Sequence, residues 1–365
     1  MDYALIIAGG SGTRLWPMST RDTPKQLIPF IDGKSLLQLA VERLQRLLPD
    51  ERIYVCAGEG HREAILGHVP SLAADRFIAE PEGRDTLNAV GLGTGVLGRD
   101  DPEAVVGVFT ADHLIEPADR FAAIVRQGYA LAEARAQALV TFGVEPTHAA
   151  TGYGYLQLDA PLEGANAFRV AQFKEKPDAD TAQQYLEAGP HCYLWNSGMF
   201  VWRAATLMRC IERFAPENYA GLQRCIEAWR TPRWDEVLRQ VYPTLRKISV
   251  DYAVMEPATG EQAGDGEVEV VAVPLAVRWL DVGSWPSFAQ TRASDEAGNC
   301  AAGCHTLMLD TRNTLAASSH DGHLIAAIGV EDLIVIHTPR ATLVCRADQA
   351  ERIKELHKQL GEDWV

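Results

Sequence analysis

A run of small and charged residues near the start of the chain, GGSGTR at positions 9–14, has the composition of a phosphate-binding turn. It follows the apolar residues 5–8, which are long enough for a buried strand. Glycines after such a strand let a ligand approach the backbone closely, and free amides there can bind phosphate. Arg14 and Lys25 add two positive charges. The pattern predicts a polyphosphate cradle, although glycines alone would also fit a tight turn without a ligand.

Two common nucleotide-binding patterns do not fit this stretch. The dinucleotide fingerprint needs G-x-G-x-x-G, and the glycines at positions 9, 10 and 12 have another spacing. The P-loop needs a lysine directly after its glycines, and no lysine stands there. The stretch is therefore evidence for phosphate binding of a different kind.

Two aspartates, Asp112 and Asp281, are candidate ligands for a divalent cation. Asp112 follows the apolar residues 105–109, and Asp281 stands in the sequence WLDVGS. Mg²⁺ prefers oxygen ligands, often one or two carboxylates together with substrate phosphates. Two aspartates far apart in the sequence meet this demand if the fold unites them; the alternative is that each caps a loop. We interpret His113, beside Asp112, as structural.

Three further polar residues, Glu175, Lys176 and Asn196, are candidates for recognising a phosphorylated sugar. The ammonium group of Lys176 can neutralise a phosphate, while Glu175 and Asn196 can bind hydroxyl groups. The commonest fate of a lysine is nevertheless a solvated surface position, so this alternative stays open for Lys176.

Strand and helix patterns alternate through the first part of the chain. Apolar runs at 53–57, 77–79, 105–109 and 139–143 read as strands, and residues 35–48, 82–98 and 121–138 read as helices. Such alternation predicts an α/β fold with a parallel sheet and helices on both faces. Ligands bind beyond the carboxyl ends of the strands in such sheets, so the glycine turn and Asp112 are expected to face one crevice.

The pattern changes after Asp295. Short β-prone pieces recur at 306–309, 324–328, 333–336 and 341–344, followed by a helical pattern over 347–360. We therefore predict two domains, 1–290 and 291–365, the second small and β-rich.

Composition excludes several classes of partner. The chain has 365 residues and a net charge of −15, which argues against a nucleic-acid surface. No apolar run approaches the length of about 18 residues that a membrane-spanning helix needs, and the early strand leaves no room for a signal peptide. Seven scattered cysteines indicate reduced thiols in a cytoplasmic protein.

Taken together, the motifs resemble those of sugar-1-phosphate nucleotidyltransferases, and among them the mannose-1-phosphate guanylyltransferases. The resemblance covers nearly the whole chain and rests on residues 9–17 with Pro24-Lys25, 80–81, 112–113, 152–155, 175–177, 195–200, 250–256 and 281–285.

This resemblance implies a Rossmann-like domain with a mixed, mainly parallel sheet and helices on both faces, followed by a left-handed β-helix-like domain that often helps to form a homodimer. It implies transfer of GMP from GTP to α-mannose 1-phosphate, with Mg²⁺. The family pattern assigns nucleotide binding to Ala8, Gly9, Gly10, Ser11, Gly12, Thr13, Pro81, Asp85 and Thr86, catalysis to Arg14, Lys25, Asp112 and Asp281, metal binding to the same two aspartates, and sugar-phosphate binding to Gly154, Glu175, Lys176 and Asn196.

Two departures from the family pattern qualify these assignments. The family usually has Arg-Asn-Thr-Ala-Pro-Ala near the guanine, whereas this chain has RDTLNA at 84–89. Asp85 only accepts hydrogen bonds, which suits guanine N1 and N2 but could also signal another nucleotide. The residues after Asp295 are too few for the isomerase barrel of bifunctional relatives, so no isomerase activity is expected.

Other functions stay open on the sequence alone. The chain could use another sugar 1-phosphate or another nucleotide, or it could be a catalytically silent sensor of nucleotide sugars. A dinucleotide-dependent oxidoreductase is a more distant alternative, because the glycine spacing is wrong for it.

Overall fold

A computed structural model describes residues 1–365 except 11, 22, 30, 32, 261–263, 265–266, 321, 362–363 and 365. Ser11, predicted to bind the nucleotide, lies outside the described residues. A nine-stranded sheet has the order β3-β2-β1-β4-β9-β6-β10-β8-β7. Its strands are β1 (Asp2–Ile7), β2 (Ile53–Gly58), β3 (Phe77–Glu80), β4 (Val105–Thr110), β6 (Ala138–Val144), β7 (Tyr155–Pro161), β8 (Phe168–Lys174), β9 (Tyr193–Arg203) and β10 (Glu269–Pro274).

The sheet is mixed but mainly parallel, as predicted. Strands β3, β2, β1 and β4 run parallel to one another, and β6 runs parallel to β10. The long strand β9 lies antiparallel between β4 and β6, and β8 and β7 are antiparallel additions beyond β10. Because β1 and β4 are parallel neighbours, the loops that follow them lie at the same edge of the sheet.

Helices cover both faces of the sheet, which confirms the predicted layering. Alternate residues of β1 show how: Ala4 and Ile6 pack into one core, while Leu5 packs into the other. The first core includes residues of α1 (Leu36–Leu44), α2 (Arg62–His68) and α4 (Ala118–Ala134). The second includes residues of α3 (Asp85–Asp100), α6 (Ala204–Phe214), α7 (Pro216–Ala228) and α8 (Trp234–Val241), and α5 (Ala179–Ala188) follows β8.

Two helix predictions were too long. The pattern over 121–138 runs past the end of α4 at Ala134, because Ala138 pairs with Glu269 of β10 and begins β6 instead. Strand pairing here overrides the helical preference of an alanine-rich sequence. The helix predicted over 35–48 ends at Leu44, although its predicted N-cap, Ser35, does form a capping box with Gln38.

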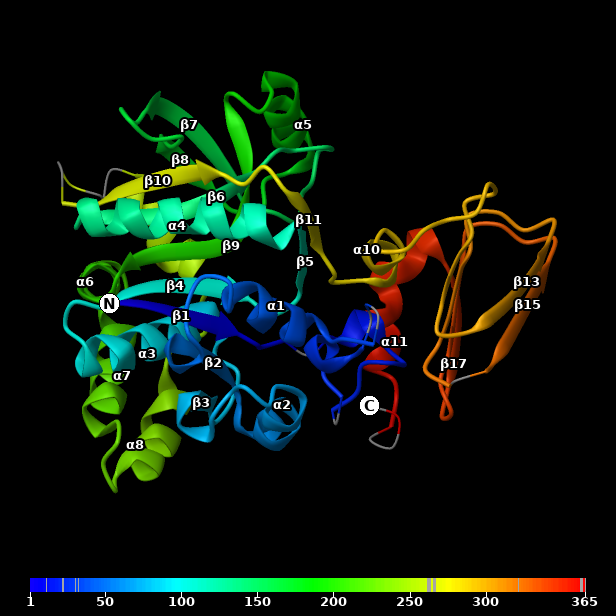
Figure 1. Ribbon diagram of the computed structural model, residues 1–365, viewed down its shortest axis with the longest axis horizontal. Coiled ribbons are helices and arrows are strands. Elements are labelled where there is room, and N and C mark those ends of the chain that lie inside the picture. Colours follow the sequence, from blue (N-terminus) through cyan, green and yellow to red (C-terminus); the bar gives the residue numbers. More distant parts are fainter. Residues whose placement is uncertain are drawn as a thin grey trace.

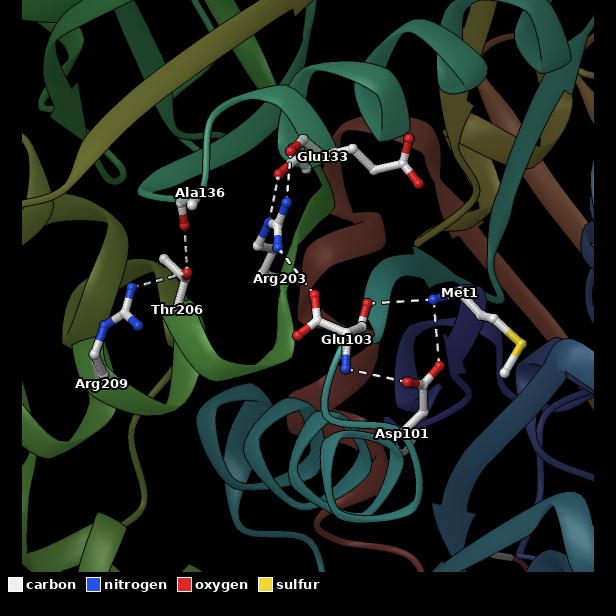
Figure 2. A network of polar contacts seen from close by, with 9 residues as sticks. Met1, Asp101, Glu103, Glu133, Ala136, Arg203, Thr206 and Arg209 are labelled. Atoms are coloured by element: carbon white, nitrogen blue, oxygen red, sulfur yellow. Dashed lines mark hydrogen bonds and ion pairs between the residues drawn. The ribbon is translucent and has the colours of Figure 1, made fainter.

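A polar network fixes the edge of the sheet where β1 and β4 begin (Figure 2). The Met1 amino group lies 3.2 Å from Asp101 Oδ2, and it also donates to the Glu103 carbonyl oxygen. Arg203, the last residue of β9, donates to the Glu133 carbonyl oxygen at 2.6 Å and pairs with the Glu103 carboxylate at 3.4 Å. These contacts lie at the opposite edge of the sheet from the glycine turn.

A two-stranded sheet that the sequence did not indicate connects distant parts of the chain. Strand β5 (His113–Glu116) pairs antiparallel with β11 (Arg278–Asp281), so that Asp281 lies opposite His113. The strand before Asp112 ends at Thr110, and Asp112 occupies the bend between β4 and β5. This pairing brings Asp281 to the carboxyl edge of the main sheet.

The C-terminal strands stand apart from the main sheet, with α10 (Trp285–Ala289) and α11 (Ile353–His357) between them (Figure 1). They form a four-stranded sheet, β12-β14-β16-β17, and a two-stranded sheet, β13-β15. The strands are β12 (Cys300–Ala302), β13 (His305–Leu309), β14 (Leu315–Ser318), β15 (Leu324–Ile328), β16 (Leu333–His337) and β17 (Thr342–Arg346). The helix predicted over 347–360 is a 3₁₀ segment, Ala347–Arg352, followed by the short α11.

A third core joins these C-terminal strands to the N-terminal loop. Leu15 and Trp16 pack with Trp285, Leu315 and Ile336 in one cluster. The Trp16 indole also donates to the Trp364 carbonyl oxygen at 2.8 Å. The two predicted domains therefore share buried surface around residues 15–16. Within the described residues, no helix is long and apolar enough to cross a membrane.

Candidate active site

The glycine turn continues from β1 and holds its shape by close packing. Gly12 has a φ of 57°, a left-handed conformation that disfavours side chains. A Cβ atom on Gly12 would lie 2.5 Å from Ser19 Oγ and 2.8 Å from Lys25 Cβ. Any larger residue would therefore push Lys25 away from the turn. Thr13 begins the 3₁₀ turn Thr13–Leu15, while Ala8 is buried and its carbonyl oxygen accepts from Gln26.

Lys25, Asp112 and Asp281 form one charged cluster beside this turn. The Lys25 ammonium lies 2.5 Å from Asp112 Oδ2. Burial alone would lower the pKa of Lys25, but the charges of Asp112 and Asp281 raise it above its usual value. Burial would likewise raise the pKa of Asp112, but Lys25 and His113 hold it below its usual range. Burial and the charge of Asp112 raise the pKa of Asp281.

The two aspartates suit a divalent cation. Asp281 is destabilised in its charged form by burial and by the Asp112 carboxylate, so a cation placed between the two carboxylates would relieve their repulsion. The described residues contain no group of three or more His, Cys, Asp or Glu side chains with metal-binding geometry, and the candidate ligands are the two carboxylates of Asp112 and Asp281. Such a sparse oxygen site matches the preference of Mg²⁺ for sharing its ligands with substrate phosphates and water.

His113 is packed as a structural residue, in agreement with its interpretation from the sequence. It is 6% exposed, and its Nδ1 atom lies 2.6 Å from Thr110 Oγ1 and 3.1 Å from the Trp279 indole nitrogen. Burial lowers the pKa of His113. The ring therefore supports the bend that carries Asp112.

Arg14 points towards the C-terminal segment. Its Nε atom lies 2.9 Å from Glu351 Oε2. Both residues line a cavity of about 560 Å³ together with Asp281, Gly283 and Tyr153. Glu351 was not among the predicted site residues, because nothing in a charged C-terminal stretch distinguishes this carboxylate from its neighbours.

A second cavity of about 650 Å³ is lined by the glycine turn and the start of α3. It is lined by four predicted nucleotide-binding residues, Gly9, Gly10, Asp85 and Thr86. Asp85 has a φ of 66°, an uncommon conformation for a residue with a side chain, and its Oδ1 atom accepts from the Thr86 amide at 2.8 Å. Such strained residues cluster at ligand sites. Pro81, in contrast, does not line this cavity.

Further residues of this cavity were not predicted. Lys247, His61 and Glu80 are among the other residues that line it. The Tyr242 hydroxyl donates to Glu80 Oε1 at 2.6 Å, and burial raises the pKa of Glu80. The sequence did carry a signal for Glu80, since it belongs to the Glu80-Pro81 motif. Lys247 and His61 stand in no motif.

The predicted sugar-phosphate residues also lie together. The Lys176 ammonium contacts Glu175 Oε1 at 2.5 Å, and a Cβ atom on Gly154 would lie 2.6 Å from Glu175 Oε2 and 3.4 Å from Asn196 Cβ. Glu175 and Asn196 are buried, whereas the Lys176 side chain is 54% exposed. One residue of the cluster was not predicted: Asp251, whose Oδ1 atom accepts from Asn196 Nδ2 at 3.0 Å.

These features define an α/β protein with a nucleotide-sized cavity, a charged cluster and a second polar cluster around Glu175 at one edge of its sheet. The family model described as nucleotidyl transferase matches residues 3–298. The chain therefore belongs to the nucleotidyl transferase family. A second family model, described as the MannoseP isomerase/GMP-like beta-helix domain, matches residues 305–360, in agreement with the predicted β-helix-like segment.

Named relatives extend this assignment over nearly the whole chain. The xanthan biosynthesis protein XanB of Xanthomonas campestris pv. campestris (strain B100) is 35% identical over 362 residues, which cover 98% of this chain and 72% of the relative. The mannose-1-phosphate guanylyltransferase of Escherichia coli (strain K12) is 32% identical, covering 99% of this chain and 74% of the relative. A crystal structure from Thermus thermophilus, described as mannose-1-phosphate geranyltransferase, matches with a TM-score of 0.85, 31% identity and 98% coverage of both chains.

Proposed function

We propose that this protein transfers GMP from GTP to α-D-mannose 1-phosphate, giving GDP-mannose and pyrophosphate. One observation carries the proposal: the glycine turn, the Lys25–Asp112–Asp281 cluster and the polar cluster around Glu175 all lie beside one edge of the sheet. These three parts are what a nucleoside triphosphate, a reacting phosphate and a sugar require. Relatives at 31–33% identity that are named mannose-1-phosphate guanylyltransferases support the choice of substrates.

The reaction proceeds by direct displacement. A phosphate oxygen of the sugar attacks the α-phosphorus of GTP, a new P–O bond forms, and the bond from the α-phosphorus to the bridging oxygen breaks to release pyrophosphate. The attacking phosphate is already anionic at neutral pH, so no general base is needed. The backbone of residues 8–13, with Arg14 and Lys25, holds the triphosphate and neutralises its charge.

Asp112 and Asp281 would hold Mg²⁺ near the reacting phosphate. The bound ion would neutralise charge on the phosphates and help to orient them. The two carboxylates would hold the ion, and the ammonium of Lys25 would neutralise the charge of Asp112 when the ion is not bound.

Substrate recognition is divided between the nucleotide cavity and the polar cluster around Glu175. Asp85 and Thr86 would read the base, because the carboxylate of Asp85 can accept from guanine N1 and N2. Glu175 and Asn196 would bind sugar hydroxyls, the backbone of Gly154 would approach the sugar ring, and the exposed Lys176 would bind the sugar phosphate.

A substrate panel tests the proposal. Pyrophosphate release is measured with GTP, UTP, dTTP and ATP, each combined with mannose, glucose and heptose 1-phosphates, with and without Mg²⁺. We expect turnover with GTP and mannose 1-phosphate, dependent on Mg²⁺. A preference for another pair would assign another substrate within the family, and binding of GDP-mannose without any turnover would instead identify a sensor.

The metal assignment has a test of its own. Asp281→Ala should lower kcat about hundredfold or more, since a group that stabilises developing charge typically contributes this much. The matched control is Asp159→Ala, an exposed carboxylate on β7. Near-normal turnover of Asp281→Ala in the presence of Mg²⁺ would remove Asp281 from the metal site.

We also propose that the protein forms a homodimer through the outer face of β13 and β15. Leu307, Leu309, Leu324 and Ile328 lie on one face of this two-stranded sheet, and each is at least 50% exposed. An apolar face of this kind is typical of a contact between subunits. Sedimentation of Leu309→Asp and Ile328→Asp, compared with the unchanged chain, should show monomers; an unchanged mass would exclude this face.

A further inference from the structure

Asp251 belongs to the polar cluster around Glu175 that we assign to the sugar phosphate, but the mechanism above gives it no role. It is the first residue of a π-helical turn, Asp251–Met255, a rare conformation that is frequent at functional sites. Its Oδ1 atom accepts from Asn196 Nδ2 at 3.0 Å, and Asn196 Oδ1 in turn accepts from Thr141 Oγ1 at 2.9 Å. The orientation of Asp251 is thus fixed from β9 and β6.

The polar cluster around Glu175 has more hydrogen-bond acceptors than donors. Among the described side chains, Asn196 is the hydrogen-bond donor to Asp251, and Lys176 is the donor to Glu175. Within the described part of the chain, the Oδ2 atom of Asp251 and the Oε2 atom of Glu175 accept from no side chain. Burial and the nearby charge of Glu175 raise the pKa of Asp251 to about 7, partly offset by Lys176 and Asn196. Hydroxyl groups of a ligand would supply the missing donors.

The two carboxylates differ in their access to a ligand. Glu175 packs against the backbone of Gly154, where a Cβ atom would lie only 2.6 Å from Glu175 Oε2. Lys176 has a φ of 45°, a conformation that costs free energy for a residue with a side chain, and its ammonium lies 2.5 Å from Glu175 Oε1. Asp251 is partly exposed, whereas Glu175 is buried, so Asp251 is the more accessible of the two residues.

Asp251 is tied to the nucleotide cavity by its own chain segment. The Val250 amide donates to Thr86 Oγ1 at 3.0 Å, and the Leu87 amide donates to the Ile248 carbonyl oxygen at 3.2 Å. Lys247 of the same segment lines the nucleotide cavity. A sugar held by Asp251 would therefore be held in a fixed position relative to the nucleotide.

We propose that Asp251 is a recognition residue of the sugar subsite, whose Oδ2 atom accepts a hydrogen bond from one hydroxyl of the sugar 1-phosphate while Glu175 accepts from a different hydroxyl. This inference rests on the proposed function. It makes Asp251 a determinant of which sugar is used, because an acceptor that the bound sugar covers is costly to leave without a hydroxyl partner.

The test pairs residue changes with hydroxyl deletions. The values of kcat/KM for mannose 1-phosphate and its 2-, 3-, 4- and 6-deoxy analogues are compared for the unchanged protein, Asp251→Asn and Glu175→Gln. For the unchanged protein, we expect two of the analogues to lose about 10- to 100-fold. Asp251→Asn should remove the penalty for one of them, and Glu175→Gln the penalty for the other, each to within about threefold. The KM for GTP should stay the same in Asp251→Asn.

The controls separate recognition from folding and from the proposed function. Asp180→Asn, an exposed carboxylate on α5, should behave as the unchanged protein with every analogue. If Asp251→Asn melts at a lower temperature, Asp251→Ser is measured in its place. The inference would be overturned if, for each of the four analogues, the unchanged protein and the Asp251 variant lost the same factor in kcat/KM. Failure of the unchanged protein to use mannose 1-phosphate at all would overturn the proposed function instead.

Discussion

Replacing Gly12 by alanine should uncouple the glycine turn from the charged cluster. The new Cβ atom would lie 2.5 Å from Ser19 Oγ and 2.8 Å from Lys25 Cβ, which is closer than real Cβ contacts. The left-handed φ of 57° costs alanine about 1–2 kcal/mol, and the overpacking adds about 1–3 kcal/mol unless Lys25 moves. Moving Lys25 relieves the clash but separates its ammonium from Asp112. A displacement of about 1 Å in a positioning group can lower the rate about hundredfold.

A matched glycine isolates the effect of the clash. Gly164 has a φ of 76°, and no atom lies within 4 Å of the place that its Cβ would take, so Gly164→Ala carries the backbone strain without the contact. Steady-state pyrophosphate release and thermal unfolding are measured for both variants. We expect both to lose stability, and Gly12→Ala alone to lose about 10- to 100-fold in kcat/KM for GTP. Equal activities of the two variants would refute the argument that Gly12 is needed to keep Lys25 in place.

Three further predictions concern charge. Glu351→Gln frees Arg14 from its 2.9 Å ion pair and removes a negative charge from the cavity, so the KM for GTP should fall a few-fold, more at low salt, with little change in stability; an unchanged KM at both salt concentrations would contradict this. Arg203→Gln should lower stability by about 1–3 kcal/mol, because the Glu133 carbonyl oxygen and the Glu103 carboxylate lose their donor. The value of kcat should stay the same, since these contacts lie at the edge of the sheet away from the site. The pKa of Asp251 is raised in the folded protein to about 7, so its contribution to stability is present below the unfolded value near 4 and is lost as the pH rises through 7. The melting temperature of Asp251→Asn relative to the unchanged protein should therefore rise between pH 4 and pH 8; a constant difference would show that Asp251 titrates normally.

The sequence predicted the layered half of the fold because its signal is local. Runs such as residues 105–109 are apolar throughout, as expected for strands covered on both faces. The position of β9 between β4 and β6 had no such signal, since antiparallel insertion into a parallel sheet depends on contacts between distant segments. The pairing of β5 with β11 was missed for the same reason, and it is this pairing that brings Asp281 near Asp112.

The site residues that the sequence predicted stand in motifs. Most of those that it missed are brought to the site by tertiary packing. Gly9, Gly10, Asp85 and Thr86 line one cavity, as a shared nucleotide role requires. Their functional roles stay predictions until variants are measured. Lys247 and Glu351 reach their cavities only through tertiary packing, whereas Asp251 did stand in a family motif whose purpose the sequence could not show.

The third core also bears on when during protein synthesis the loop after β1 can become ordered. Trp16 lies close in the chain to the arginine of the glycine turn, yet its indole donates to the Trp364 carbonyl oxygen, and its own carbonyl oxygen accepts from the Trp285 indole. The ribosome makes residues 15–16 long before their packing partners in β14 and β16. A nascent chain that has completed the nine-stranded sheet would therefore still lack these partners, and the loop should become ordered only after β16 has been made.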